Sequence, residues 1–279
     1  MYKVLDLFAG IGGFSLGLER TGGFETVAFC ELDEKAQLVL KKHWPGVPVY
    51  GDVKELTVER LKADGVVPTV IAGGFPCQDI SSAGRGKGII GERSGLWSEM
   101  FRLIRDVRPA WAIIENVSVL RSRGLALVLQ NLSEIGYCAE WHCIPASAVG
   151  APHRRDRIWI VADTNNGHIR QEGKICPGGN STQPSGKDVA DTKGFGVEGS
   201  RAIGEQVSQL QIGKEISRCH SSGSRASHWA IEPGVGRVAN GVPNRVDRLK
   251  QLGNAVVPQI PQLIGEAILA AETIHKGNQ

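Results

Sequence analysis

Residues 70–77, Val-Ile-Ala-Gly-Gly-Phe-Pro-Cys, form the stretch that most constrains how this chain can fold. The apolar run at 70–72 predicts a short buried strand, and the two glycines after it permit a sharp turn. Pro76 then fixes φ immediately before a thiol. We therefore predict that Cys77 lies on a rigid turn at the carboxyl end of a strand, where the active sites of α/β proteins lie. The alternative is a small buried hydrophobic side chain, which is the commoner role of a cysteine.

Length and composition indicate a soluble globular protein. The 279 residues can bury a large core and could form one large domain or two smaller ones. Hydrophobic residues make up 41% of the chain and charged residues 22%. No apolar run reaches the ~18 residues of a membrane span, and the strand-like start is no signal peptide, so we expect a cytoplasmic protein. The net charge is only +3, so any nucleic-acid surface must be local.

Six cysteines are scattered along the chain without a C-x-x-C pair. This arrangement argues against a zinc ribbon and against a disulfide framework, and it suits a reducing cytoplasm. We expect no metal site, because the candidate ligands in the second half of the chain lack close spacing. These candidates are Cys176, Cys219, His220 and His228.

Residues at the ends of the first three predicted strands indicate a pocket for a nucleoside. A strand at 3–8 precedes a glycine-rich loop at 9–13 and a helix, a turn suited to ligand binding, although the same glycines could serve only close packing. The second strand, 25–30, ends in Glu31, whose position ~20 residues beyond the glycine turn predicts a bond to ribose hydroxyls. The alternative for such a carboxylate is a helix N-cap, a role that we assign to Asp33.

A third short strand at 47–53 carries Asp52 near its end. This carboxylate could accept a hydrogen bond from an adenine amino group, or it could cap a helix at 55–62. No phosphate loop of the G-x-x-x-x-G-K-[ST] type occurs, and the turn at 9–13 contains no lysine or arginine to neutralise a pyrophosphate. The pattern therefore favours a nucleoside without phosphates, such as S-adenosylmethionine, over ATP or NAD.

The segment after the thiol is rich in glycine and in basic residues. Residues 81–95 contain Arg85, Lys87 and Arg93, and a flexible basic loop beside a nucleophile could close over a polyanion and exclude water. The alternative is a solvated linker. A helix is predicted at 96–107, where apolar residues recur on one face.

Charged residues also mark the later strands. A strand at 109–114 ends in Glu115, which is the natural acid partner of a thiol on the neighbouring strand. Farther on, three arginines lead into another apolar strand. Strand alternation places Arg155 and Arg157 on one face. This favours contacts to phosphate or substrate, with surface salt bridges as the alternative.

The character of the chain changes at residue 163. From 163 to 235 glycine and serine are plentiful and hydrophobic periodicity fades, as expected of a small recognition domain or a partly disordered segment. One continuous helix is expected before it at 120–135, and periodicity returns in a last helix at 259–275. We predict one domain formed by residues 1–162 plus 236–279, interrupted by a second at 163–235.

Five segments of the chain resemble the motifs of the DNA (cytosine-5) methyltransferase family, in that family's order and spacing. They are residues 6–13, 74–78, 115–117, 153–157 and 252–258. His153 stands where the family usually has glutamine, whereas Arg155 and Arg157 match it. The compact size is similar to that of short bacterial and prophage members.

The resemblance implies an α/β fold, a doubly wound, mostly parallel sheet of the Rossmann-like S-adenosylmethionine-dependent methyltransferases, with a small target-recognition domain inserted at 163–235. The last helix would return beside the first strand and bring Asn254 to the cofactor. The residues that the resemblance implies for S-adenosylmethionine binding are Phe8, Ala9, Gly10, Gly12, Gly13, Glu31, Leu32, Asp52, Val53, Pro76, Leu96, Asn254 and Val256.

The resemblance also implies the chemistry. Cys77 would attack C6 of a flipped-out cytosine as a thiolate, so that C5 can accept the methyl group. Glu115 would contact N3 and the exocyclic amine of the base, and Arg157 the carbonyl O2. Arg155 would support Glu115 or bind a phosphate.

The implied partner is double-stranded DNA, bound by a monomer, and a cognate restriction endonuclease is a candidate for a further partner. Side chains near the thiol would contact the DNA, namely Gln78, Ser81, Arg85, Lys87 and Arg93. The bases would be read by the segment 163–235. Its basic candidates are Arg201, Lys214, Arg218 and Arg225.

Three other functions fit parts of the pattern. A cytosine methyltransferase that acts on transfer RNA would share the fold and the motifs, although the long insert at 163–235 favours DNA. A catalytically silent DNA-binding prophage copy would bind without turnover, but Cys77, Glu115, Arg157 and Asn254 are all present. A Rossmann oxidoreductase would need a hydride-transfer constellation, and none is visible.

Overall fold

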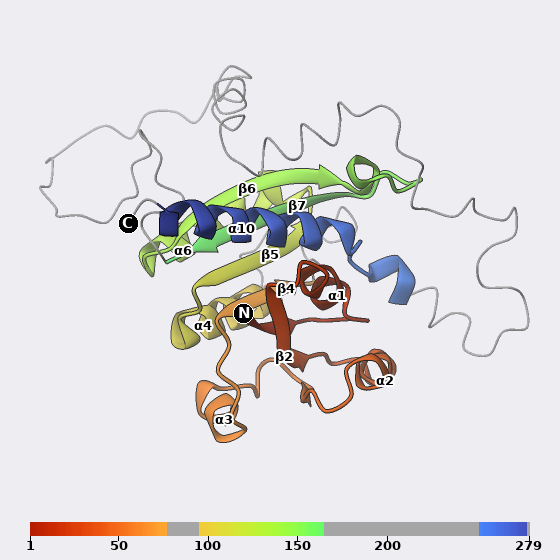
Figure 1. Cartoon of the computed structure of the whole chain (residues 1–279), viewed down its shortest axis with the longest axis vertical. Helices are drawn as coiled ribbons and strands as arrows, with labels where there is room; N and C mark the ends of the chain where they lie inside the picture. Colours follow the sequence, from red (N-terminus) through yellow and green to blue (C-terminus); the bar gives the residue numbers. More distant parts are fainter. Residues whose placement is uncertain (77–94, 165–250, 278–279) are drawn as a thin grey trace, which may run out of the picture.

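The computed structural model describes residues 1–76, 95–164 and 251–277, and in these it contains a seven-stranded sheet in the order β3-β2-β1-β4-β5-β7-β6 (Figure 1). The strands are β1 (Tyr2–Leu7), β2 (Phe24–Cys30), β3 (Val49–Tyr50), β4 (Val70–Gly74), β5 (Trp111–Val117), β6 (Cys138–Pro145) and β7 (Asp156–Asp163). The helices are α1 (Gly13–Glu19), α2 (Glu34–His43), α3 (Val58–Ala63), α4 (Gly95–Val107), α5 (Leu120–Arg123), α6 (Leu125–Glu134) and α10 (Gln259–Gly277), with a 3-10 turn, η2, at Ala146–Val149.

The sheet is parallel except at one edge. Strand β1 pairs in parallel with β2 on one side and with β4 on the other, and β3 and β5 continue these two halves in parallel. Strand β7 runs antiparallel to both β5 and β6. Strands are therefore added outward from β1 on one side and from β4 on the other. The boundary between β1 and β4 is the topological switch point, where open α/β sheets bind ligands. The predicted doubly wound, mostly parallel sheet is confirmed.

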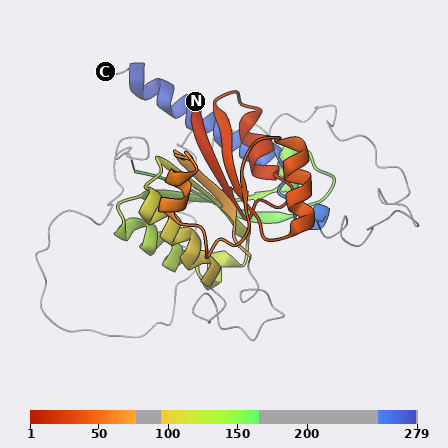
Figure 2. The same cartoon turned by 90° about the horizontal axis from the view of Figure 1, so that it is seen from below.

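Helices cover both faces of this sheet (Figures 1 and 2). On one face, Phe14 of α1 and Ile264 of α10 share a buried cluster with Val4 of β1. On the other face, Met100 of α4 and Val128 of α6 belong to the larger buried cluster. A parallel sheet covered on both faces explains why its strands read as continuous apolar runs. Among the residues that the structure describes, no helix combines the length and the apolar character that a membrane crossing requires.

Side-chain caps mark where two of the helices, α2 and α3, begin. Asp33 accepts hydrogen bonds from the amides of Lys35 and Ala36, so its prediction as the N-cap of α2 is confirmed. For Asp52, the alternative role as a helix N-cap is wrong, because α3 begins at Val58 and Thr57 caps it.

The single helix predicted over 120–135 is also wrong. Gly124 has φ of 160° and separates α5 from α6. The backbone leaves the helical conformation at this residue, a break that the apolar periodicity on either side did not indicate. The helices predicted at 96–107 and 259–275 correspond to α4 and α10.

The C-terminal segment packs closely against the first helix, as Figures 1 and 2 show for α1 and α10. A Cβ atom at Gly13 would lie 2.6 Å from the carbonyl oxygen of Val256, and one at Gly17 would overlap that of Pro258. Only glycine leaves room for this approach. The predicted return of the last helix to the N-terminal part of the domain is therefore observed. Apart from Asp163 and Thr164, the predicted recognition domain at 163–235 lies outside the described residues.

Candidate active site

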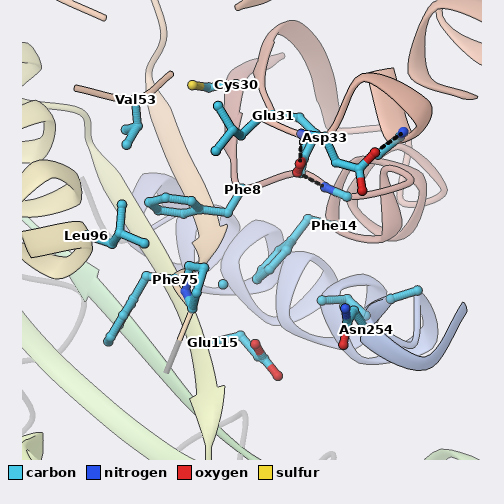
Figure 3. A pocket seen from close by; sticks show the side chains of 18 of the residues that line it. Phe8, Phe14, Cys30, Glu31, Asp33, Val53, Phe75, Leu96, Glu115 and Asn254 are labelled. Carbon is cyan, nitrogen blue, oxygen red and sulfur yellow. Dashed lines mark hydrogen bonds between the residues drawn. The ribbon is translucent and has the colours of Figure 1, made fainter. Parts of the chain in front are cut away.

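A cavity of about 740 Å³ opens at the carboxyl ends of β1, β2, β4 and β5 (Figure 3). Most of the residues predicted to bind a cofactor line it, and Glu115, Arg155 and Arg157 line it as well. The predicted cofactor residues in its wall are Phe8, Ala9, Gly10, Glu31, Leu32, Asp52, Val53, Pro76, Leu96, Asn254 and Val256. Residues separated by more than two hundred positions thus meet at one site.

Glu31 is fixed in the wall by two backbone amides. Its carboxylate accepts hydrogen bonds from the amide of Gly10, at 2.7 Å, and from that of Asp33, at 2.8 Å; Figure 3 shows Glu31 and Asp33 together at one end of the cavity. The first bond ties the glycine turn to the end of β2. A carboxylate has about four acceptor positions, so Glu31 can still accept hydrogen bonds from a ligand.

Gly12 and Gly13, also predicted as cofactor residues, are not among the lining residues. A Cβ atom at Gly12 would lie 2.6 Å from the indole ring of Trp44, and Gly13 packs against Val256. The structure therefore places these two glycines in packing contacts next to the cavity. This is the alternative that the sequence left open for the turn.

Asp6 stabilises the same turn through the start of α1. Gly12, the N-cap of α1, offers no side-chain hydrogen bond, and the Asp6 carboxylate instead accepts from the amide and hydroxyl of Ser15, at 3.3 and 2.8 Å. The Asp6 side chain is fully buried, and this burial raises its pKa to about 7. The sequence contained a signal for this role, a carboxylate at the end of an apolar strand before an uncapped helix, but no such role was predicted.

Glu115 and Arg157 form an ion pair at the opposite end of the cavity. Strand register places Glu115 beside Gly74 of the neighbouring strand, and the Nε atom of Arg157 lies 2.9 Å from Oε1 of Glu115. In the view of Figure 3, the rings of Phe8 and Phe14 lie between Glu31 and Glu115. The predicted position of Glu115 beside the strand that leads to Cys77 is therefore observed.

Burial and charge act on Glu115 in opposite directions. Burial raises the pKa of Glu115 and is the larger effect, while the charges of Arg157 and Arg155 act to lower it. The net pKa lies above that of an ordinary glutamic acid. A carboxyl group of this kind keeps its proton to higher pH than an ordinary glutamic acid and can supply that proton or a hydrogen bond to a ligand.

Asn116, next to Glu115, joins two strand ends. Its Nδ2 donates to the carbonyl oxygen of Phe75 at 2.9 Å, and its Oδ1 accepts from the amide of Val117 at 2.8 Å. The side chain is buried. Asn116 therefore holds the turn at Phe75 and Pro76 to the end of β5. Asn116 belongs to the motif segment 115–117, but no role was predicted for it.

Arg155 does not lie in a strand, where it was predicted. Strand β7 begins at Asp156, so Arg155 precedes it, and its φ of 36° is left-handed. It therefore does not share a strand face with Arg157. Its guanidinium donates to the backbone carbonyls of Gly253 and Asn254, and it acts on Glu115 through its charge.

Several predicted site residues lie outside the described part of the chain. Pro76, the last residue before Cys77, lines the cavity. The thiol itself and the predicted DNA-contacting side chains belong to residues outside the described ranges. These residues are Cys77, Gln78, Ser81, Arg85, Lys87, Arg93, Arg201, Lys214, Arg218 and Arg225. Within the described ranges, no cluster of three or more His, Cys, Asp or Glu side chains could hold a metal ion.

Comparison with known proteins relates the chain to DNA-modifying enzymes. A family model described as C-5 cytosine-specific DNA methylase matches residues 2–217. The chain is 40% identical over 168 residues to the Type II methyltransferase M2.BsuMI of Bacillus subtilis, covering 57% of this chain and 41% of that protein. It is 36% identical over 163 residues to the Type II methyltransferase M.CviJI of a Paramecium bursaria Chlorella virus, covering 58% and 43%. The chain thus spans less than half the length of either relative.

Solved structures show the same architecture. A putative DNA modification methyltransferase encoded within an Escherichia coli prophage superposes with a TM-score of 0.50 at 28% identity, covering 58% of this chain and 47% of that one. The DNMT2 protein of Spodoptera frugiperda superposes with a TM-score of 0.51 at 22% identity, covering 62% and 54%. The second likeness concerns the fold alone.

Proposed function

Because the chain belongs to the C-5 cytosine-specific DNA methylase family, we propose that it transfers a methyl group from S-adenosylmethionine to C5 of cytosine in double-stranded DNA. One observation carries the proposal. A single cavity has an anchored carboxylate suited to ribose, Glu31, at one end and a buried acid–arginine pair, Glu115 and Arg157, at the other. A nucleoside cofactor and a base could therefore meet within it.

The residues present fit S-adenosylmethionine. The volume of about 740 Å³ lies within the usual range of ligand pockets. Glu31 would accept hydrogen bonds from the ribose hydroxyls, Asp52 would accept one from the adenine amino group, and Phe8 and Leu96 would provide apolar contacts. When bound, the cofactor supplies a methyl group on a sulfonium centre.

The residues of the chain would do the rest of the chemistry. Cys77, as a thiolate, would form a bond to C6 of the cytosine, which makes C5 nucleophilic enough to take the methyl group. Loss of the C5 proton and cleavage of the sulfur–C6 bond would then release the product. Glu115 would donate a proton or hydrogen bond to N3, and Arg157 would contact O2.

The target base must leave the duplex to reach this site, at a cost of a few kcal/mol. The proposal assigns sequence reading to residues 163–235, and DNA contacts to the basic segment that contains Arg85, Lys87 and Arg93. We further propose that the protein acts as a monomer in the cytoplasm, and that a restriction endonuclease recognises the same site.

The experiment is methyl transfer from labelled S-adenosylmethionine to unmethylated bacterial DNA, followed by bisulfite sequencing. We expect label at C5 of cytosine within one short recurring sequence, and no label with the variant Cys77→Ser. Label on RNA but not on DNA would replace the proposal with an RNA methyltransferase. Cofactor binding without label on either polymer would indicate a silent copy.

A further inference from the structure

Arg155 connects two parts of the cavity wall that are far apart in the sequence. Its guanidinium donates hydrogen bonds to the backbone carbonyls of Gly253 and Asn254, the second at 3.0 Å. Both carbonyls belong to the helical residues 251–254, which lead into the segment before α10. Asn254 and Val256 line the cavity, so the arginine ties this C-terminal part of the wall to the start of β7.

The backbone of Arg155 is strained, with φ of 36° in the left-handed region that residues with a Cβ atom rarely adopt. Such strain persists only where surrounding contacts hold the residue in place. Here the two carbonyls hold the side chain, and the backbone carbonyls of Arg154 and Arg155 both accept from the amide of Ala146. Arg157, two residues later, lies within β7 and pairs with Glu115, so the two arginines hold different parts of the site.

We propose that Arg155 is a positioning residue of the cofactor site, which holds the segment 254–256 in the cavity wall beside the Glu115–Arg157 pair. The inference rests on the proposed function, because it takes this cavity to bind S-adenosylmethionine. Two N–H groups of one planar guanidinium fix both carbonyls in direction and distance, which a lysine ammonium does not do. If Arg155 served only the base or a phosphate, its loss would leave cofactor binding without DNA unchanged.

The test is the affinity of the full chain for S-adenosylhomocysteine without DNA, measured by calorimetry. We expect Arg155→Ala to raise the Kd about tenfold, the effect of losing about one hydrogen bond to a charged group, and Arg155→Lys to restore only part of this affinity. Arg154→Ala is the matched control. It removes the same charge from the adjacent residue, whose side chain is 84% exposed and pairs with Asp156, and we expect its Kd to equal that of the unsubstituted chain.

Hydrogen exchange gives a second readout. The amide of Ala255 donates to the carbonyl of Gln251 at 2.9 Å, and its exchange should accelerate in both Arg155 variants but not in Arg154→Ala. If Arg155→Ala does not fold, the lysine variant still provides both measurements.

The outcomes separate the two proposals. Unchanged affinity and exchange in the Arg155 variants would overturn the positioning role, as would an equal loss of affinity in Arg154→Ala. Absence of binding by the unsubstituted chain would instead overturn the proposed function and this inference with it.

Discussion

Glu115 and Asp6 are both buried carboxyl groups, but only one of them can meet a ligand. Glu115 lines the cavity beside two arginines. Asp6 is fully buried near the end of β1 and contacts Ser15 of α1. Burial raises the pKa of both groups. We therefore expect the protonation of Glu115 to affect turnover and that of Asp6 to affect stability.

The variant Glu115→Gln tests the first expectation. Because the folded-state pKa of Glu115 is raised, its acid form persists to higher pH, and turnover that needs this proton should fall as pH rises through that pKa. Glutamine can donate a hydrogen bond but no proton. We expect single-turnover methyl transfer to fall by about 10²–10⁴-fold, the usual contribution of general acid catalysis, and this alkaline decline to disappear, with S-adenosylhomocysteine affinity unchanged. A variant that keeps the rate and the pH profile would remove Glu115 from the proposed chemistry.

The variant Asp6→Asn tests the second expectation. The pKa of Asp6 rises from 3.8 to about 7 on folding, so the folded state binds the extra proton. The contribution of Asp6 to the free energy of unfolding should therefore be fully present below about pH 4 and be lost as pH rises through about 7, a decrease of roughly 4 kcal/mol from this group. Urea unfolding of Asp6→Asn at several pH values should show a much smaller decrease. Glu115 contributes a decrease of the same sign, which should remain.

At the scale of helices and strands, local patterns predicted most of the elements that position the site. The end of β2 before Glu31 was placed correctly because a short apolar run followed by a polar residue is a local signal. The predicted end before Glu115 was wrong, because β5 continues to Val117 through its pairing with β7. The break at Gly124 was missed, since glycine inside an apolar helical pattern has more than one outcome. The bonds from Arg155 to Gly253 and Asn254 join residues 98 and 99 positions apart, and no local pattern encodes such a pairing.

The contact between α1 and the segment before α10 leads to a prediction for Gly13→Ala. The new Cβ atom would lie 2.6 Å from the backbone oxygen of Val256, so the C-terminal segment must move away from the glycine turn. We expect a loss of about 1–3 kcal/mol in the free energy of unfolding and weaker binding of S-adenosylhomocysteine. Gly95→Ala is the control, because no atom lies within 4 Å of its added Cβ. Equal effects of the two substitutions would contradict the close packing.

At the scale of the whole molecule, the cavity is completed only when both ends of the described chain come together. The glycine turn follows β1, whereas Asn254 and Val256 precede α10. A ligand that touches both parts binds the folded chain and not the unfolded one, so its binding free energy adds to the stability of the entire unit.

The last prediction follows from this linkage and from the chemistry of the turn. S-adenosylhomocysteine at 100 times its Kd should stabilise the fold by about 2.7 kcal/mol, which for a unit of this size raises the Tm by roughly 5–10 °C. ATP and NAD at equal concentration should produce little shift, because residues 9–13 contain no lysine or arginine to neutralise phosphates. Thermal unfolding followed by circular dichroism measures the Tm of the protein with each of the three ligands. A larger shift with NAD would revive the oxidoreductase alternative, since the cavity would then accept a pyrophosphate despite the uncharged turn.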